Sequence, residues 1–248
     1  MKSKVTLVAL AAAMLSSGAA FAQAKAEPEF TVTGNAGLFS EYRFRGISQT
    51  NKKAAFQGGF DVAHKSGFYL GNWNSNVNSQ FYNGANLELD FYGGYKGTVG
   101  GIGYDIGAIY YYYPGSGDIP LTSKIDNTEI YIGASAGPFS AKYYHATSDF
   151  FSVPGTKNSY YLDLAFAYDL GDGLGVNAHV GYQKVKGVSG PAGKITDYKV
   201  GLTKDISGSG YIAGVSYITT NRDDTFFDPT SGKDIGKGTL LLSLSKTF

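Results

Sequence analysis

The sequence ends on Leu240-Leu241-Leu242-Ser243-Leu244-Ser245-Lys246-Thr247-Phe248, a stretch in which leucines alternate with serines over its middle part. Alternation with a period of two residues is typical of a β-strand with one apolar face. A closing strand that ends on phenylalanine, in a chain that opens with an export signal, indicates an outer-membrane β-barrel. One face of each barrel strand meets lipid and the other meets the lumen, so alternation sorts the residues into two sets.

The opposite end of the sequence has the pattern of a cleaved export signal. Two lysines precede an apolar run over residues 5–15, and a small-residue exit follows at residues 20–22. The run is too short for a membrane-spanning helix. We therefore predict a signal peptide over residues 1–22 and one mature domain over residues 23–248, exported to the envelope of a Gram-negative cell.

Composition excludes several other classes of protein. The mature chain would carry 19 basic and 20 acidic residues without a basic cluster, which argues against a nucleic-acid partner. There is no cysteine, so neither disulfides nor thiolate metal sites are available. Beyond the signal no segment supplies the roughly 18 consecutive apolar residues of a spanning helix, which leaves a closed barrel as the way to cross lipid. A secreted β-sandwich would have a similar composition.

Twelve segments alternate and are bounded by turn residues. They are 30–45, 54–65, 67–77, 86–97, 101–113, 127–136, 139–148, 158–169, 173–184, 195–205, 209–220 and 238–248. Their connections are alternately short and long, as turns and external loops are in a barrel with both termini on the periplasmic side. All seven prolines fall outside the segments. We predict an all-β fold, a transmembrane antiparallel barrel of twelve strands surrounded by outer-membrane lipid.

The two faces are clearest in a few of these segments. In 30–45 an apolar face that ends on Tyr42 and Phe44 alternates with a polar face that ends on Glu41, Arg43 and Arg45. We expect the apolar face to meet lipid and the polar face to meet the lumen. In 67–77 both faces carry large apolar residues, so its lipid face stays unassigned.

Several stretches carry a family resemblance. Asn35-Ala36-Gly37-Leu38-Phe39-Ser40-Glu41-Tyr42-Arg43-Phe44-Arg45-Gly46-Ile47-Ser48-Gln49-Thr50 resembles the TorF family of outer-membrane porins, and Gln57-Gly58-Gly59-Phe60-Asp61 is similar to that family too. The resemblance covers essentially the whole mature chain. It implies a barrel of porin architecture and lends neither a substrate nor a catalytic residue. One departure is Lys246, where such strands commonly have an apolar residue, although its stem can reach the membrane interface.

Charged residues on the predicted inner faces are the candidates for lining a pore. They are Glu41, Arg43, Arg45, Asp61, Glu88, Asp90, Lys96, Asp105, Glu129, Lys142, Asp163, His179 and Lys199, with Asp197 as a further acid. Arg43 and Arg45 can form a constriction that selects carboxylates, because a guanidinium group matches carboxylate geometry. The alternative is that they brace the wall by pairing with the inward acids Asp61, Glu88 and Asp90. Acids outnumber bases, so the sign of any charge selectivity stays open.

The strand count predicts a tight passage. About eight strands leave an interior just filled by side chains, and about sixteen leave an aqueous channel. Twelve lie between, and inward tyrosines narrow the lumen further; they are Tyr111, Tyr113, Tyr131, Tyr144 and Tyr161. We expect a porin-like channel for the passive diffusion of small solutes or ions, without a cofactor. A plugged barrel with a structural or surface-binding role is the alternative.

An outer-membrane hydrolase is the rival from another class of function. It would need a serine paired with a histidine. His64 lies at a turn, His145 falls on the lipid-facing phase, and His179 points inward without an adjacent nucleophile. The last loop has four aspartates within residues 221–237 but lacks the spacing of a calcium loop. We therefore expect neither catalysis nor a bound metal.

Overall fold

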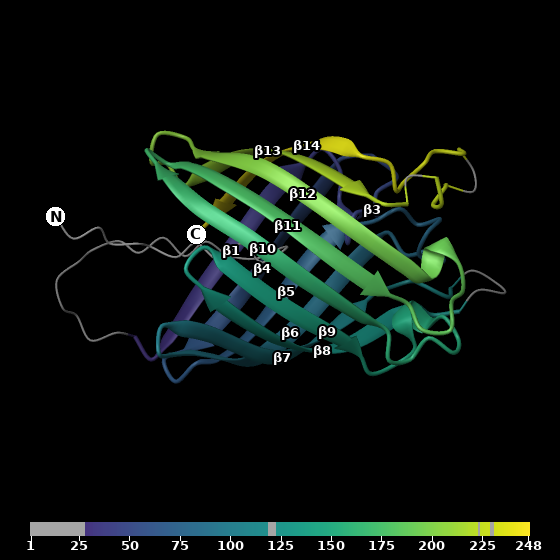
Figure 1. Cartoon of the computed structure of the whole chain (residues 1–248), viewed down its shortest axis with the longest axis horizontal. Coiled ribbons are helices and arrows are strands. Elements are labelled where there is room, and N and C mark those ends of the chain that lie inside the picture. Colours follow the sequence, from purple (N-terminus) through teal and green to yellow (C-terminus); the bar gives the residue numbers. More distant parts are fainter. Residues whose placement is uncertain (1–27, 119–122, 223, 229–230) are drawn as a thin grey trace.

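The computed structural model describes residues 28–118, 123–222, 224–228 and 231–248, and the predicted signal peptide over residues 1–22 lies outside them. Twelve antiparallel strands close into a barrel (Figure 1). They are β1 (Phe30–Phe39), β4 (Ala55–His64), β5 (Phe68–Asn76), β6 (Leu87–Val99), β7 (Ile102–Tyr112), β8 (Asp126–Ala136), β9 (Phe139–Ala146), β10 (Tyr160–Gly171), β11 (Leu174–Lys184), β12 (Lys194–Asp205), β13 (Tyr211–Thr220) and β14 (Thr239–Thr247). The predicted twelve-stranded antiparallel barrel is confirmed.

The closure of the barrel depends on the first and last strands. β14 pairs with β1 from Asn35↔Thr247 to Phe39↔Ser243. Beyond this ladder Gly34 and Phe248 exchange two backbone hydrogen bonds, of 2.7 and 2.8 Å. Every strand thus has two neighbours, which leaves no sheet edge with unpaired backbone groups.

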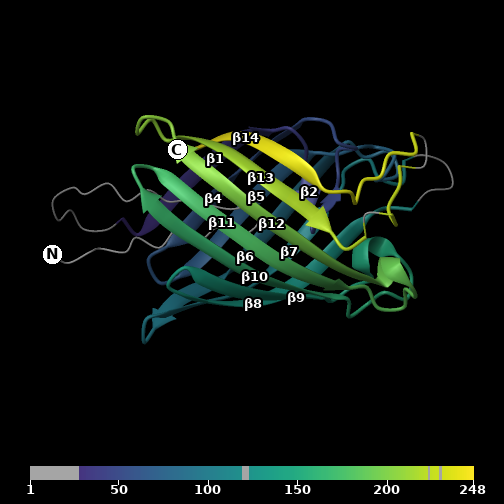
Figure 2. The ribbon, with the colours of Figure 1, turned by 45° about the horizontal axis from the view of Figure 1, so that its top comes forward.

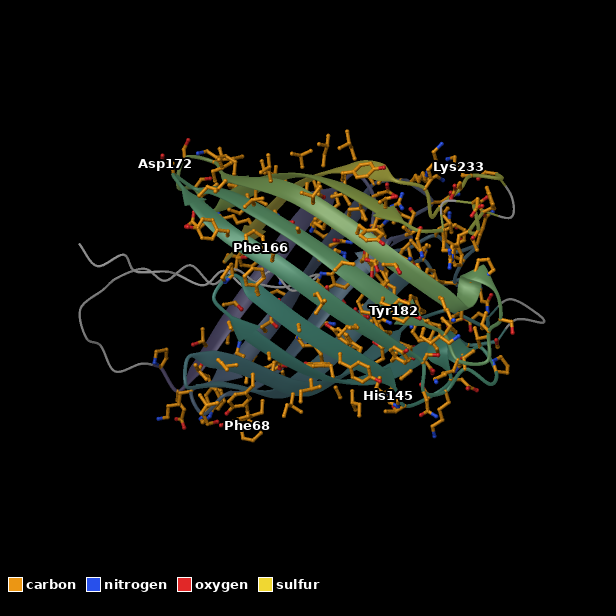
Figure 3. The ribbon with its side chains drawn as sticks, in the orientation of Figure 1. Phe68, His145, Phe166, Asp172, Tyr182 and Lys233 are labelled. Carbon is orange, nitrogen blue, oxygen red and sulfur yellow. The ribbon has the colours of Figure 1, made fainter. Side chains whose placement is uncertain are left out.

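The alternation of the sequence becomes an apolar exterior and a polar interior. On β10, Leu162 and Leu164 are exposed whereas Tyr161 and Asp163 are buried. Figure 3 shows Phe68, Phe166 and Tyr182 pointing away from the barrel axis. β5, whose outer face the sequence leaves open, exposes Phe68 and Leu70 and buries Trp73. The exterior is therefore the kind of surface that lipid solvates.

The two ends of the barrel differ. The short turns lie at the end where β1 begins and β14 finishes, on the left in Figure 2, and the long connections lie at the other end. The long connections hold the remaining elements, which are β2 (Arg43–Phe44), β3 (Ile47–Ser48) and the 3₁₀ turns η1 (Phe150–Ser152) and η2 (Pro191–Gly193). No helix in the described part of the chain is long and apolar enough to cross a membrane.

The first predicted strand is too long. The alternation over residues 30–45 predicts one strand, but β1 stops at Phe39. β4 begins at Ala55, opposite Phe39, so residues beyond Ser40 have no strand on the β4 side with which to pair. On the other side the ladder with β14 ends at Phe39↔Ser243, although β14 itself begins four residues earlier, at Thr239. They leave the wall and enter the lumen.

Candidate functional site

The connection from β1 to β4 folds back into the barrel. We call residues 40–53 the inner segment. Its hairpin pairs Phe44 with Ile47 and turns at Arg45 and Gly46, both with positive φ. A side chain at position 46 would also meet Asp197 Cβ at 2.7 Å, so only glycine permits this turn so close to the wall. The inner segment crosses the lumen near the end that carries the long connections.

Arg45 anchors the inner segment to the wall. Its Nη2 lies 2.6 Å and its Nη1 3.1 Å from the two carboxylate oxygens of Glu129 on β8. Nη1 also donates a hydrogen bond to Gln183 on β11, and the guanidinium carbon lies 4.3 Å from the centre of the Tyr161 ring. Burial alone would lower the pKa of Arg45, but Glu129 raises it above its ordinary value. A charged group therefore links two separate strands across the lumen.

Arg43 stabilises the inner segment from the side of the long connections. Its Nε lies 3.0 Å from Glu41 Oε2. Its Nη groups donate to the carbonyl oxygens of Gly46 at 2.7 Å, Ile235 at 3.2 Å and Lys237 at 2.9 Å. The planar guanidinium group of Arg43 donates to all three carbonyl oxygens. Arg43 thus joins the inner segment to the connection between β13 and β14.

The prediction of which acids pair with Arg43 and Arg45 is wrong. The sequence suggests Asp61, Glu88 and Asp90, whereas the ion pairs go to Glu41 and Glu129. The two arginines also do not point the same way from one strand. The pairing prediction assumed a continuous first strand, and the turn at Arg45 and Gly46 sends the two side chains in different directions.

The aromatic residues of the inner segment pack inside the barrel. Tyr42 donates to Glu88 Oε1 at 3.2 Å and packs edge-on against Trp73 of β5, with ring centres 5.3 Å apart. Phe44 packs against Tyr111 of β7 at 5.7 Å. The prediction that Tyr42 and Phe44 meet lipid is therefore wrong, because it also rested on a continuous first strand.

A second group of charged residues lies nearer the short turns. Lys142 Nζ on β9 lies 2.7 Å from Asp105 Oδ2 on β7. Tyr69 on β5 donates to the other oxygen of Asp105 at 2.5 Å. Lys96 on β6 stands 5.4 Å from the centre of the Tyr69 ring. Lys142 and Asp105 remain 23% and 25% exposed, so solvent reaches this part of the interior.

His179 on β11 bridges two carboxylates. Its Nδ1 lies 2.9 Å from Asp163 Oδ1 on β10 and its Nε2 lies 3.0 Å from Asp197 Oδ1 on β12. Lys199 is the register partner of His179 on β12. Tyr161 donates to Asp197 at 3.1 Å, which connects this group to the ring beside Arg45.

The remaining predicted residues lie on the opposite side of the interior. Asp61 of β4 accepts a hydrogen bond from Tyr92 of β6 at 2.7 Å. Glu88 and Asp90 of β6 are buried and each keeps one carboxylate oxygen without a hydrogen-bond partner in the described residues. The structure thus separates the candidates into groups around the inner segment and groups near the short turns.

Sequence reasoning missed several residues that complete these contacts. Gln183, Tyr69 and Tyr92 supply hydrogen bonds to Arg45, Asp105 and Asp61. Gln183 and Tyr92 lie on the inward phase of their strands, which is a signal that the sequence contains, whereas the sequence leaves the phase of Tyr69 unassigned. A search restricted to charged side chains leaves out neutral hydrogen-bonding residues.

Two of the three histidines lie apart from the charged groups described above. His64 contacts Ser66 and Glu29 near a turn, and His145 contacts Tyr143 and Asn158. Figure 3 places His145 on the outside of the barrel. No group of three or more acids or histidines able to hold a metal occurs among the described residues. Asp223, one of the four aspartates of the last connection, lies outside them.

Comparisons with known proteins give a family match and similar solved structures. Residues 23–248 match the model of the family described as "Bacterial protein of unknown function (Gcw_chp)". No curated protein matches the sequence. Among solved structures, the KdgM porin in complex with disordered oligogalacturonate is similar, with a TM-score of 0.53 and 9% identity over 88% of this chain and 99% of that chain. The NanC porin is similar with a TM-score of 0.55 and 9% identity over the same shares. At 9% sequence identity, the similarity to these two porins concerns the fold alone.

Proposed function

The chain belongs to the Gcw_chp family, whose description assigns no function, and we propose that it is a narrow outer-membrane channel for the passive diffusion of small solutes or ions. The observation that carries this proposal is the solvent-exposed ion pair of Lys142 and Asp105 inside a closed barrel. A barrel filled by its own side chains would bury such a pair. A barrel with water along one wall gives a small solute a polar path.

The surroundings of the barrel follow from the same proposal. The apolar exterior suits outer-membrane lipid, and the end with the short turns would face the periplasm. Export would depend on cleavage of residues 1–22, which leaves residues 23–248 as the mature domain. The resemblance to TorF porins, and the use of the inward charged residues to line the pore, belong to the same proposal.

A second function is favoured by one observation. Arg45 holds the inner segment with a buried, bidentate ion pair, and a fixed segment across the lumen is what a plugged barrel would have. Such a barrel would act through its long connections as a structural or surface-binding protein. We assign no catalytic role to the channel or to the plugged barrel.

Permeation through reconstituted protein tests the proposal. Liposomes containing the folded protein are diluted into iso-osmotic solutions of uncharged sugars of increasing size, and swelling is followed by light scattering. We expect fast swelling with the smallest solutes and a sharp decrease with size. Liposomes with heat-unfolded protein are the control. Swelling no faster than this control at every size would contradict the channel and favour the plugged barrel.

A further inference from the structure

One register row of the barrel carries charges that alternate in sign over its first four charged residues and end on a second acid. Lys96 pairs with Asp105, Asp105 with Gly133, Gly133 with Lys142, and Lys142 with Asp163. The same row continues through Gly181 to Asp197. All these positions are on the inward phase of their strands. We call Lys96, Asp105, Lys142, Asp163 and Asp197 the charge ladder.

The charge ladder runs along the barrel and does not merely circle it. Lys96 lies three residues from the short-turn end of β6, whereas Asp197 lies three residues from the opposite end of β12. Barrel strands tilt by about 40°, so a register row climbs roughly 3 Å along the axis with each strand. The tilt is visible in Figure 1. The row therefore leads from the short turns up to the inner segment, where Asp197 lies beside Gly46.

Two glycines in the row make the charged groups continuous. A side chain at Gly133 would lie 3.1 Å from Lys142 Cε, and Lys142 reaches across this position to Asp105. A side chain at Gly181 would lie 2.5 Å from Asp197 Oδ2, where Tyr161 and His179 meet that carboxylate. Without a side chain at Gly133, Lys142 contacts Asp105 across β8, and without one at Gly181, His179 reaches both Asp163 and Asp197.

The wall opposite the charge ladder is neutral and small. β14 lies opposite β8 in the strand order, and its inward residues near the short turns are Ser243 and Ser245. The neighbouring inward residues are Gly214 on β13 and Thr33 and Asn35 on β1. Small and neutral inward side chains therefore face the charged wall near the short turns.

The charges at the short-turn end of the ladder, Lys96, Asp105 and Lys142, can exchange partners at low cost. Solvent-exposed ion pairs contribute little to stability, because water competes for both groups. The Lys142–Asp105 pair is partly exposed, and Lys96 is exposed and forms no ion pair among the described residues. A solute with one positive and one negative group can therefore replace each partner in turn. Over the first four charges of the ladder, a solute with a single charge is repelled at every second position.

We propose that the charge ladder is the path on which this channel favours small zwitterionic solutes, molecules with one ammonium and one carboxylate group, over neutral solutes of equal size. The proposal rests on the channel function proposed above. It names the class of solute that the wall recognises, and it assigns Lys96, Asp105 and Lys142 as the residues that determine this preference.

The test compares two isomers, alanine as the zwitterion and lactamide as the neutral solute. Protein-dependent swelling rates of proteoliposomes are measured for each, after subtracting the rate of protein-free liposomes. We expect the wild type to admit alanine about threefold faster than lactamide, the ratio that one exposed charge pair supports. The double variant Asp105→Asn/Lys142→Gln should bring the ratio close to one while lactamide still passes.

Two further variants make the test specific. Asp172→Asn/Lys204→Gln removes the same charges at the rim, where Lys204 Nζ contacts the Asp172 carbonyl, and should keep the wild-type ratio. Lys96→Gln breaks no ion pair among the described residues and should lower the ratio even where the double variant fails to fold. Equal wild-type rates for both isomers, or a ratio that survives Asp105→Asn/Lys142→Gln and Lys96→Gln, would overturn the inference. A wild type that passes neither solute would overturn the channel itself.

Discussion

Arg45 connects parts of the molecule that are far apart in the sequence. Its guanidinium group bonds Glu129 and Gln183, which are 84 and 138 residues away. Glu129 is fully buried, so its charge depends on Arg45 for compensation. Removing one member of a buried ion pair leaves an uncompensated charge, which is far more costly than the net contribution of the pair.

Replacement of Arg45 is therefore expected to destabilise the inner segment. Arg45→Ala should lower the free energy of unfolding by about 3–5 kcal/mol, measured by thermal denaturation of the detergent-solubilised protein, and should make channel currents noisier. Arg45→Lys should recover only part of the loss, because an ammonium group cannot form both bonds. Arg222→Ala, which removes a half-buried arginine that forms no ion pair among the described residues and donates only to backbone carbonyls there, is the control. An Arg45→Ala protein as stable as this control would contradict the anchoring role.

At the scale of single residues, the sequence predicts on which side of the wall a side chain lies better than it predicts its partner. The inward phase of Asp105, Lys142 and His179 follows from alternation alone. Their contacts do not, because Lys142 reaches Asp105 over Gly133, and this requires the register of β7, β8 and β9. Strand register is a property of pairs of strands and leaves no local signature.

At the scale of elements, the twelve strands of the wall agree with the alternating segments to within a few residues, apart from the first. Residues 40–45 continue the alternation of β1. Alternation predicts which face of a segment is polar, but it does not predict whether the segment belongs to the sheet. Whether a segment stays in the sheet depends on whether strands lie on both sides of it. The one local sign of departure is Gly46, whose positive φ ends any extended conformation.

Neighbouring residues of one strand test the assigned faces. Leu164 is exposed on the outside of β10, and Ala165 faces inward opposite His179. Leu164→Lys should reduce the stability of the lipid-inserted barrel by about 2–4 kcal/mol, since a charge near the middle of the lipid face is costly. Ala165→Lys should insert normally and shift the reversal potential toward anions. Urea unfolding from vesicles and a salt-gradient recording measure the two effects. Equal losses of stability in both variants would contradict the assignment of the faces.

At the scale of the whole molecule, the lumen has two unlike halves. Toward the long connections it is filled by the inner segment, with Tyr42, Phe44 and Arg45 packed among tyrosines and acids. Toward the short turns it has small residues on one wall and the charge ladder on the other. The sequence predicts a tight lumen from the strand count. It does not predict what narrows the lumen, because the fold of a connection depends on contacts with strands from the entire chain.

Single-channel recording in planar bilayers tests the central claim most directly. The wild type is compared with a variant in which residues 42–49 are replaced by glycine and serine at equal length, both shown to be folded and inserted. We predict small, discrete current steps for the wild type and clearly larger steps for the variant, because the inner segment narrows a continuous path. A wild type with no current above that of the bare bilayer would contradict the channel, and steps of equal size in both proteins would contradict the role of the inner segment.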